Sequence, residues 1–141
     1  MTRNRICRGL DAKKRVILLK LCIREIFSEF VRGTTVFGDI DVIWEGEIPD
    51  IGKTYDVELD VDEVLKWEQD IYLTCSESYT ITREGKYTVL CGTLESFDSD
   101  GYAVLRIGDY IIPFLTEGNP FNLNSRIKIR AKSIKASPIS Y

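Results

Sequence analysis

The chain has 141 residues, of which 44% are hydrophobic and 29% are charged, and its net charge is −3. This composition is typical of one soluble globular domain and excludes a disordered chain, and an apolar run such as residues 16–19 is too short to span a bilayer. Because the sequence contains no histidine, a histidine general base and a Ser-His or Cys-His nucleophile pair are excluded. We therefore expect a single cytoplasmic domain over residues 1–141 that is not an enzyme and does not associate with a membrane.

Basic and acidic residues are segregated along the chain. Residues 1–32 carry nine basic and three acidic side chains, and residues 33–70 carry two and twelve. Residues 71–121 carry three and seven, and residues 122–141 carry five basic side chains and no acidic one. One interpretation is that the basic ends fold beside the acidic middle and neutralise it. The other is that the acidic middle forms a surface for a cationic partner, because two lysines cannot balance twelve carboxylates locally.

The first segment of the chain has an ambiguous pattern. Residues 1–13 are polar and basic and predict a loosely ordered tail. In residues 16–31 polar side chains recur every four positions, which favours an amphipathic helix that Gly33 would cap. The stretch RVILLKLCI, which begins at Arg15, is also typical of a buried strand, so both interpretations stay open.

Residues 34–48 are rich in β-branched and aromatic side chains and predict a strand. Alternation places three apolar residues on one face of this strand and three acidic residues with one isoleucine on the other, namely Ile40, Val42 and Trp44 against Asp39, Asp41, Ile43 and Glu45. The turn sequence PDIGK, residues 49–53, leads into a second strand, which we expect to pair with the first as a hairpin. Residues 61–70 predict a helical turn with Asp62 as its N-cap.

The second strand of this predicted hairpin carries a row of carboxylates. The stretch YDVELDVDEV, residues 55–64, alternates apolar and acidic side chains, so Asp56, Glu58, Asp60 and Asp62 share one face over about 20 Å. Neighbouring like charges repel one another, and such a row adds no stability unless cations lie opposite. Two explanations stay open. The row pairs with the basic stretch RIKIRAK, residues 126–132, or it meets a basic partner.

Short strands separated by glycine-containing turns make up the second half of the chain. Strands are predicted at residues 71–82, 87–97, 102–107, 110–115 and 126–134. Gly92 is expected to form a bulge or a bend, and Pro113 indicates an edge strand or a strand end. The strand count predicts a mainly β fold, or an α+β fold if residues 16–31 are helical. We expect a small curled antiparallel sheet or an OB-like barrel with one N-terminal helix or strand.

The four cysteines do not predict a metal site. None belongs to a C-x-x-C pair, and no histidine is present to complete a ligand set. Phosphate-binding glycine motifs are also absent from the sequence. We expect neither a metal nor a cofactor, and we expect buried free thiols at Cys22, Cys75 and Cys91, which lie among apolar residues.

In size, acidic charge and lack of catalytic motifs, the chain resembles the small acidic immunity proteins that bacteria use against secreted toxins, often basic nucleases. This resemblance implies a toxin inhibitor whose carboxylates cover the cationic cleft of a basic toxin. Tryptophan is a frequent anchor at protein interfaces, and Trp67 lies in a polar stretch, which predicts its exposure. The implied partner-binding residues are Asp39, Asp41, Glu45, Glu47, Asp56, Glu58, Asp60, Asp62 and Glu63, with Trp67 as an anchor.

A second hypothesis comes from a different functional class. An OB-like barrel that binds nucleic acid needs a basic groove and aromatic side chains on which bases stack. The basic C-terminal strand and four tyrosines would supply them, namely Arg126, Lys128, Arg130, Lys132 and Lys135 with Tyr79, Tyr87, Tyr102 and Tyr110. The isoelectric point near 5.1 disfavours this hypothesis relative to a basic protein partner.

Overall fold

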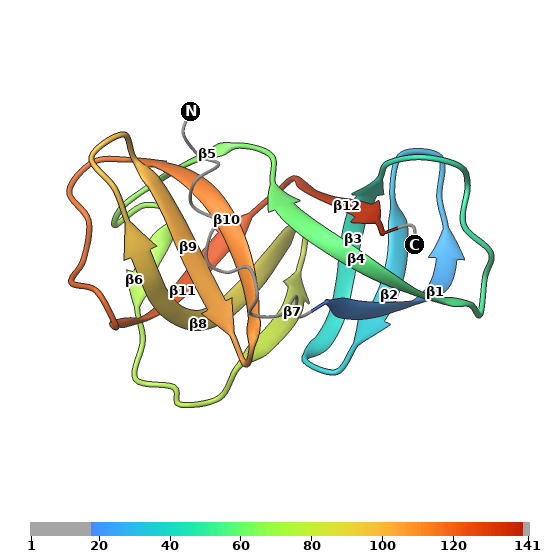
Figure 1. Cartoon of the computed structure of the whole chain (residues 1–141), viewed down its shortest axis with the longest axis horizontal. Coiled ribbons are helices and arrows are strands. Elements are labelled where there is room, and N and C mark those ends of the chain that lie inside the picture. Colours follow the sequence, from blue (N-terminus) through green and yellow to red (C-terminus); the bar gives the residue numbers. More distant parts are fainter. Residues whose placement is uncertain (1–17, 140–141) are drawn as a thin grey trace.

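The computed structural model describes residues 18–139, and every regular element in that range is a β-strand (Figure 1). The prediction of a mainly β fold is confirmed, whereas the predicted tail at residues 1–13 lies outside the described residues. The strands form two barrel-like units that lie side by side (Figure 1). No helix within the described range is long and apolar enough to cross a bilayer.

The first unit is a closed barrel of five strands in the order β1-β2-β3-β12-β4. Its strands are β1 (Leu19–Ile26), β2 (Val31–Thr35), β3 (Gly38–Trp44), β4 (Thr54–Val61) and β12 (Ile134–Pro138). Because β4 returns to lie beside β1, the first four strands form a Greek key. Strand β12 closes the barrel by pairing parallel to β3 and antiparallel to β4. A five-stranded Greek-key barrel is the arrangement of OB-folds, so the prediction of an OB-like barrel is confirmed.

The second unit is inserted between β4 and β12. Its sheet has the order β5-β10-β9-β8-β11-β6, and β7 pairs with β8 beside this path. The strands are β5 (Val64–Lys66), β6 (Ile71–Leu73), β7 (Thr80–Glu84), β8 (Tyr87–Phe97), β9 (Tyr102–Ile107), β10 (Tyr110–Glu117) and β11 (Arg126–Ala131). A single bridge between Trp67 and Ile71 brings the ends of β5 and β6 together, so the sheet is nearly closed. The bounds predicted for β8 and β9 are confirmed.

The helix expected over residues 16–31 is wrong for the described part of that range, which contains β1 and the start of β2. Leu19, Leu21 and Ile23 are buried and alternate with more exposed neighbours. Buried residues therefore recur every two positions, as in a strand, and not every 3.6 positions, as in a helix. Gly33 lies inside β2 and does not cap a helix. A Cβ atom at Gly33 would lie 2.5 Å from the Cδ1 atom of Leu21, so glycine permits the close approach of β1 and β2.

Three other local predictions also differ from the structure. Strands β3 and β4 do not form a hairpin, because β12 lies between them. Asp62 does not cap a helical turn, since residues 64–66 pair with β10 as β5 and the N–H of Asp62 donates to the carbonyl of Ser133. The turn lies later, where the carbonyl of Lys66 accepts the N–H groups of Gln69 and Asp70. The bulge between β8 and β9 lies at Leu94–Ser96 and not at Gly92. A Cβ at Gly92 would lie 2.4 Å from the carbonyl oxygen of Arg106, which explains the glycine there.

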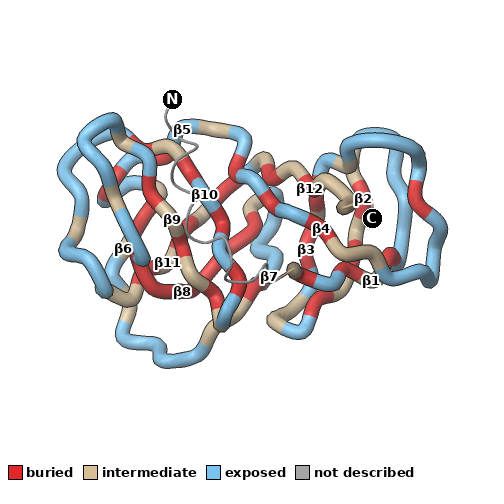
Figure 2. Tube along the Cα trace, in the orientation of Figure 1, coloured by how far each residue is buried: buried red, intermediate tan, exposed pale blue. Residues whose placement is uncertain are grey.

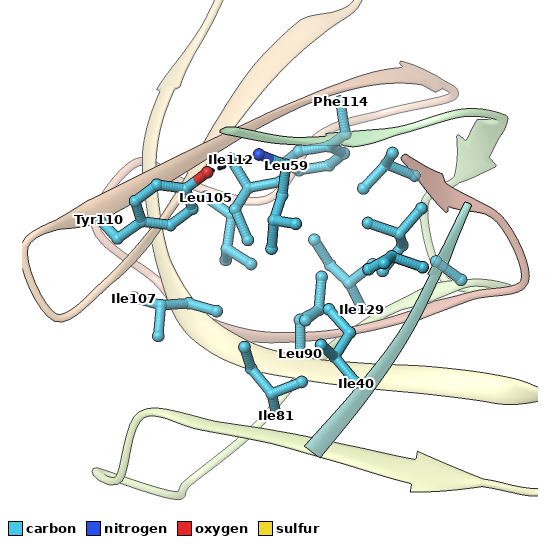
Figure 3. Packing of buried hydrophobic residues seen from close by; sticks show 14 of the residues in the cluster. Ile40, Leu59, Ile81, Leu90, Leu105, Ile107, Tyr110, Ile112, Phe114 and Ile129 are labelled. Carbon is cyan, nitrogen blue, oxygen red and sulfur yellow. Dashed lines mark hydrogen bonds between the residues drawn. The ribbon is translucent and has the colours of Figure 1, made fainter. Parts of the chain in front are cut away.

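One hydrophobic core extends through both units. Buried segments alternate with exposed ones along most strands, and the exposed segments concentrate in the loops at the two ends (Figure 2). Ile40 and Leu59 of the first unit lie in the same cluster as Leu90, Leu105 and Ile129 of the second (Figure 3). The N–H of Leu59 also donates to the hydroxyl of Tyr110 on β10, at 2.6 Å. This shared packing fixes β4 against the inserted sheet.

Candidate functional site: an acidic face on the first barrel

The alternation predicted for β4 is confirmed. Val57, Leu59 and Val61 are buried in the core, whereas Glu58 and Asp60 are exposed on the outer face of the barrel. The pairing with β12 places Asp60 opposite Lys135 and Glu58 opposite Ser137. The outer faces of β4 and β12 therefore form one continuous surface.

The prediction that the acidic row pairs with residues 126–132 is wrong. That stretch forms β11, which lies in the inserted sheet between β8 and β6. The neighbours of β4 are β1 and β12, and each supplies one ion-pairing lysine. Lys20 on β1 lies opposite Asp56, with its Nζ atom 2.8 Å from Oδ1. Lys135 is the cation supplied by β12.

Several carboxylates converge on Lys135. Its Nζ atom lies 3.5 Å from Glu45 and 3.7 Å from Asp62, and it stands in register with Asp60. Burial and the negative charge of Asp62 raise the pKa of Asp60, while Lys135 only partly opposes them. Glu58 is exposed and forms no ion pair within residues 18–139. We call the group Glu45, Glu58, Asp60 and Asp62, arranged around Lys135, the acidic face.

Two other predicted binding residues contact side chains of β2. Asp39 and Asp41 extend from β3 toward β2, where Asp41 receives two hydrogen bonds from Arg32, at 2.8 and 3.1 Å. Such a bidentate pair largely neutralises the carboxylate. The hydroxyl of Thr34 donates to Asp39 at 3.0 Å. Asp39 and Asp41 are therefore not part of the acidic face.

Glu63 and Glu47 are two further predicted binding residues that do not belong to the acidic face. The carboxylate of Glu63 accepts the backbone N–H groups of Lys132 and Ser133, at 2.5 and 2.8 Å. It thereby holds the segment that returns from the inserted unit to β12. Glu47 is exposed in the β3–β4 loop, where its backbone carbonyl accepts the indole N–H of Trp44. Glu63 has a structural contact, whereas the carboxylate of Glu47 remains at the surface.

The prediction that Trp67 is exposed is wrong, because the residue is only 6% exposed. Its ring packs edge-on against Phe97 and Phe121, with centroid separations of 6.0 and 5.2 Å. The polar residues beside it in the sequence form a turn, which allows the indole to point inward. Trp67 is therefore core and cannot anchor a partner in this conformation.

Three exposed isoleucines on β3 and in the loop that follows it were missed by the sequence analysis. Ile48 is 79% exposed and Ile51 is 64% exposed in the β3–β4 loop that begins at Glu45. Ile43, on the outer face of β3, stands in register with Lys135 and is 38% exposed. The available signal was the presence of two isoleucines within a turn sequence, where no strand alternation would bury them.

A shallow hollow of about 300 Å³ adjoins the acidic face where β4 meets the inserted sheet. Three acidic residues, Asp60, Asp62 and Glu63, line it, and apolar side chains form much of its wall. Such a hollow suits a chain with an aliphatic stem and a cationic head. The lining residues include Asp60, Asp62, Val64, Tyr102, Phe114 and Leu115.

The residues of the nucleic-acid hypothesis are divided between the two units. Arg126, Lys128 and Arg130 point outward from β11 in the inserted sheet, whereas Lys135 belongs to the acidic face. Tyr110 is buried and bonded to β4, so it is not available for stacking. The OB-like barrel therefore does not carry the basic strand that the sequence analysis assigned to it.

The cysteine prediction is confirmed only for Cys91, which is buried. Cys22 is half-buried and Cys75 is exposed in the loop after β6. Within residues 18–139, no group of three or more histidine, cysteine, aspartate or glutamate residues is arranged to hold a metal ion.

No protein-family model, curated protein or solved structure matches this chain.

Proposed function

We propose that this protein is a protein-binding module whose acidic face covers a cationic surface of a partner protein. The observation that carries this proposal is that Glu45, Asp60 and Asp62 surround one lysine, Lys135, while Glu58 forms no ion pair within residues 18–139. A row of carboxylates with too few cations contributes repulsion to the folded state. Positive side chains from a partner would relieve that repulsion, so binding would recover stability that the free protein lacks.

The surroundings of the acidic face supply apolar contact area. Ile43 is exposed on the outer face of β3, in register with Lys135, and interfaces combine such apolar contacts with a charged rim. The hollow beside Asp60 and Asp62 fits a lysine or arginine side chain of the partner, because its stem would lie on Val64 and Leu115. Long-range attraction between the opposite charges would accelerate association and would weaken with added salt.

The proposal can be made more specific about the identity of the partner. The resemblance to immunity proteins suggests a basic toxin, such as a nuclease, whose substrate cleft is positively charged. Carboxylates laid over that cleft would exclude the anionic substrate and neutralise the cations that bind it. In this proposal Glu58 and Asp60 occupy the centre of the contact, and Ile43 lies at its edge.

Charge reversal at the centre of the acidic face tests the proposal. Binding of the basic proteins encoded beside this gene would be measured by calorimetry for the wild type and for the Glu58→Lys/Asp60→Lys variant. The double variant is expected to lose binding by at least about a hundredfold, because removal of close interfacial charge pairs costs several kcal/mol. Circular dichroism should show the same folded protein.

A matched variant separates a local effect from a change in net charge. Glu77 and Glu84 are exposed on the inserted unit, away from β4, and Glu77→Lys/Glu84→Lys changes the charge by the same amount. This control should bind nearly as well as the wild type. Equal losses in both variants, or unfolding of the β4 variant, would count against the acidic face as the binding surface.

A further inference from the structure

The outer face of the inserted sheet carries a second charged surface. The strand registers place Arg106 beside Thr93 and Thr93 beside Arg126 in one row. The next rows along β11 carry Lys128 and then Arg130, opposite Cys91 and Val89 of β8. We call Arg106, Arg126, Lys128 and Arg130, with the partly exposed rings of Tyr72, Tyr79 and Tyr87, the basic face.

Tyrosine rings, and not carboxylates, hold two of these guanidinium groups. The Cζ atom of Arg130 lies 4.1 Å from the ring centroid of Tyr87, and that of Arg126 lies 4.4 Å from the ring centroid of Tyr79. Arg126 also donates to the backbone carbonyls of Ser76 and Ser78. These contacts fix the side chains without neutralising them, because the partners carry no charge.

Acidic neighbours of the basic face are few. Glu95 lies 2.9 Å from Arg106, and Glu84 stands opposite Tyr87 at the end of β7. Within residues 18–139, Lys128 and Arg130 form no ion pair. Arg32 differs from these two residues, because it forms ion pairs with Asp41 and Glu25. Cations that are held in place without counterions can bind an anionic ligand.

The basic side chains form a continuous layer over β8. Val89, Cys91 and Thr93 face the same side as these side chains, yet they are only 3%, 8% and 6% exposed. Side chains of this face therefore cover β8, and Arg126 donates to the hydroxyl of Thr93 at 3.1 Å while Arg130 lies over the ring of Tyr87. Along β11 the three cations are spaced about 7 Å apart, because alternate residues of a strand share one face.

The usual ligand face of an OB-fold is less suited to an anion in this chain. That face lies on the second and third strands of the barrel, which here carry Asp39 and Asp41. Strand β7 also packs against β3, since the N–H of Ile81 donates to the carbonyl of Phe37. A polyanion would meet carboxylates on the OB-like barrel and cations on the inserted sheet.

We propose that the basic face binds single-stranded nucleic acid. Lys128 and Arg130 would contact successive phosphates, and bases would stack on the tyrosine rings beside them. A sheet with aromatic side chains between cations is a known platform for single strands, because every base has a face that stacks. This surface is separate from the acidic face, and the inference does not rest on the protein-binding proposal.

Fluorescence anisotropy with labelled single-stranded DNA and RNA of 20 nucleotides tests the inference over a series of salt concentrations. The Lys128→Gln/Arg130→Gln variant is expected to bind at least tenfold more weakly than the wild type. Because two phosphate contacts are lost, the slope of log affinity against log salt should fall by about 1.4. The matched control, Lys53→Gln/Lys66→Gln, removes two exposed cations elsewhere and should bind as the wild type does.

Folding of each variant is verified by circular dichroism, and Lys128→Gln alone provides a milder change if the double variant is unstable. For that single variant a weaker affinity and a slope reduced by about 0.7 are expected. Absence of wild-type binding at about 50 mM salt would overturn the inference. So would equal losses in the basic-face and control variants, or self-association of the protein through this face without any affinity for nucleic acid.

Discussion

Lys135 is the residue whose surroundings define the acidic face. Its ammonium group lies near Glu45 and Asp62, and β12 places it beside Asp60. One positive charge cannot compensate these carboxylates, so the pKa of Asp60 remains raised by burial and by Asp62. The alternation of β4 predicted that Asp60 faces outward. It could not predict Lys135, because residues 62–133 separate β4 from β12 in the sequence.

Removal of the charge at Asp60 should stabilise the protein. A raised folded-state pKa means that the carboxylate destabilises the folded state above that pKa. Asp60→Asn is therefore expected to raise the free energy of unfolding at pH 7 by up to about 0.5 kcal/mol, the usual range for a surface change. As the pH falls toward 4, Asp60 takes up a proton more readily in the folded state than in the unfolded state, and the difference between the two proteins should shrink. Urea unfolding at several pH values measures this, and a variant that is less stable at pH 7 would contradict it.

The strand predicted at residues 71–82 divides into β6 and β7, and the packing of β7 was not predicted. Its sequence alternates and ends at the predicted turn, but its contact with β3 joins the two units. Gly38 makes that contact possible, because a Cβ there would lie 1.9 Å from the carbonyl oxygen of Ile81 and its φ is 141°. The sequence analysis placed Gly38 inside a strand over residues 34–48, whereas its steric role depends on a strand more than forty residues away.

Gly38→Ala should therefore disrupt the junction between β3 and β7. The clash with the backbone of Ile81 adds to the unfavourable φ, so a loss of about 3 kcal/mol or more in the free energy of unfolding is expected. Gly52→Ala is the matched control, since Gly52 has a φ of 89° but no atom within 4 Å of an added Cβ. That control should lose only about 1 kcal/mol. Similar losses in the two variants, measured by urea unfolding, would show that the contact with Ile81 is unimportant.

At the scale of the whole molecule, two units share one core and carry charges of opposite sign on separate faces. The acidic face lies on β4 and β12, and the basic face lies on β8, β9 and β11. Each unit also contains one tryptophan, Trp44 on β3 and Trp67 after β5, and both pack against the common core. Shared packing of this kind predicts that neither unit unfolds alone.

Single-tryptophan variants test this cooperativity. Trp67→Phe leaves Trp44 as the reporter of the first barrel, and Trp44→Phe leaves Trp67 as the reporter of the inserted sheet. Within each variant, the fluorescence transition and the circular dichroism transition in urea are expected to have the same midpoint. Fluorescence and circular dichroism midpoints that differ by more than about 0.5 M urea within one variant would indicate two independently unfolding units.

The sequence by itself determined the strand content, most turns of the second half and the outward direction of Glu58 and Asp60. These properties depend on the alternation of neighbouring residues and on turn chemistry, which are local. Only the tertiary structure decided that β12 lies between β3 and β4, that Trp67 is buried and that the basic strand β11 is remote from the acidic row. Pairing of strands is a contact between distant parts of the chain, and its free energy depends on the whole core and not on the pattern of any one segment.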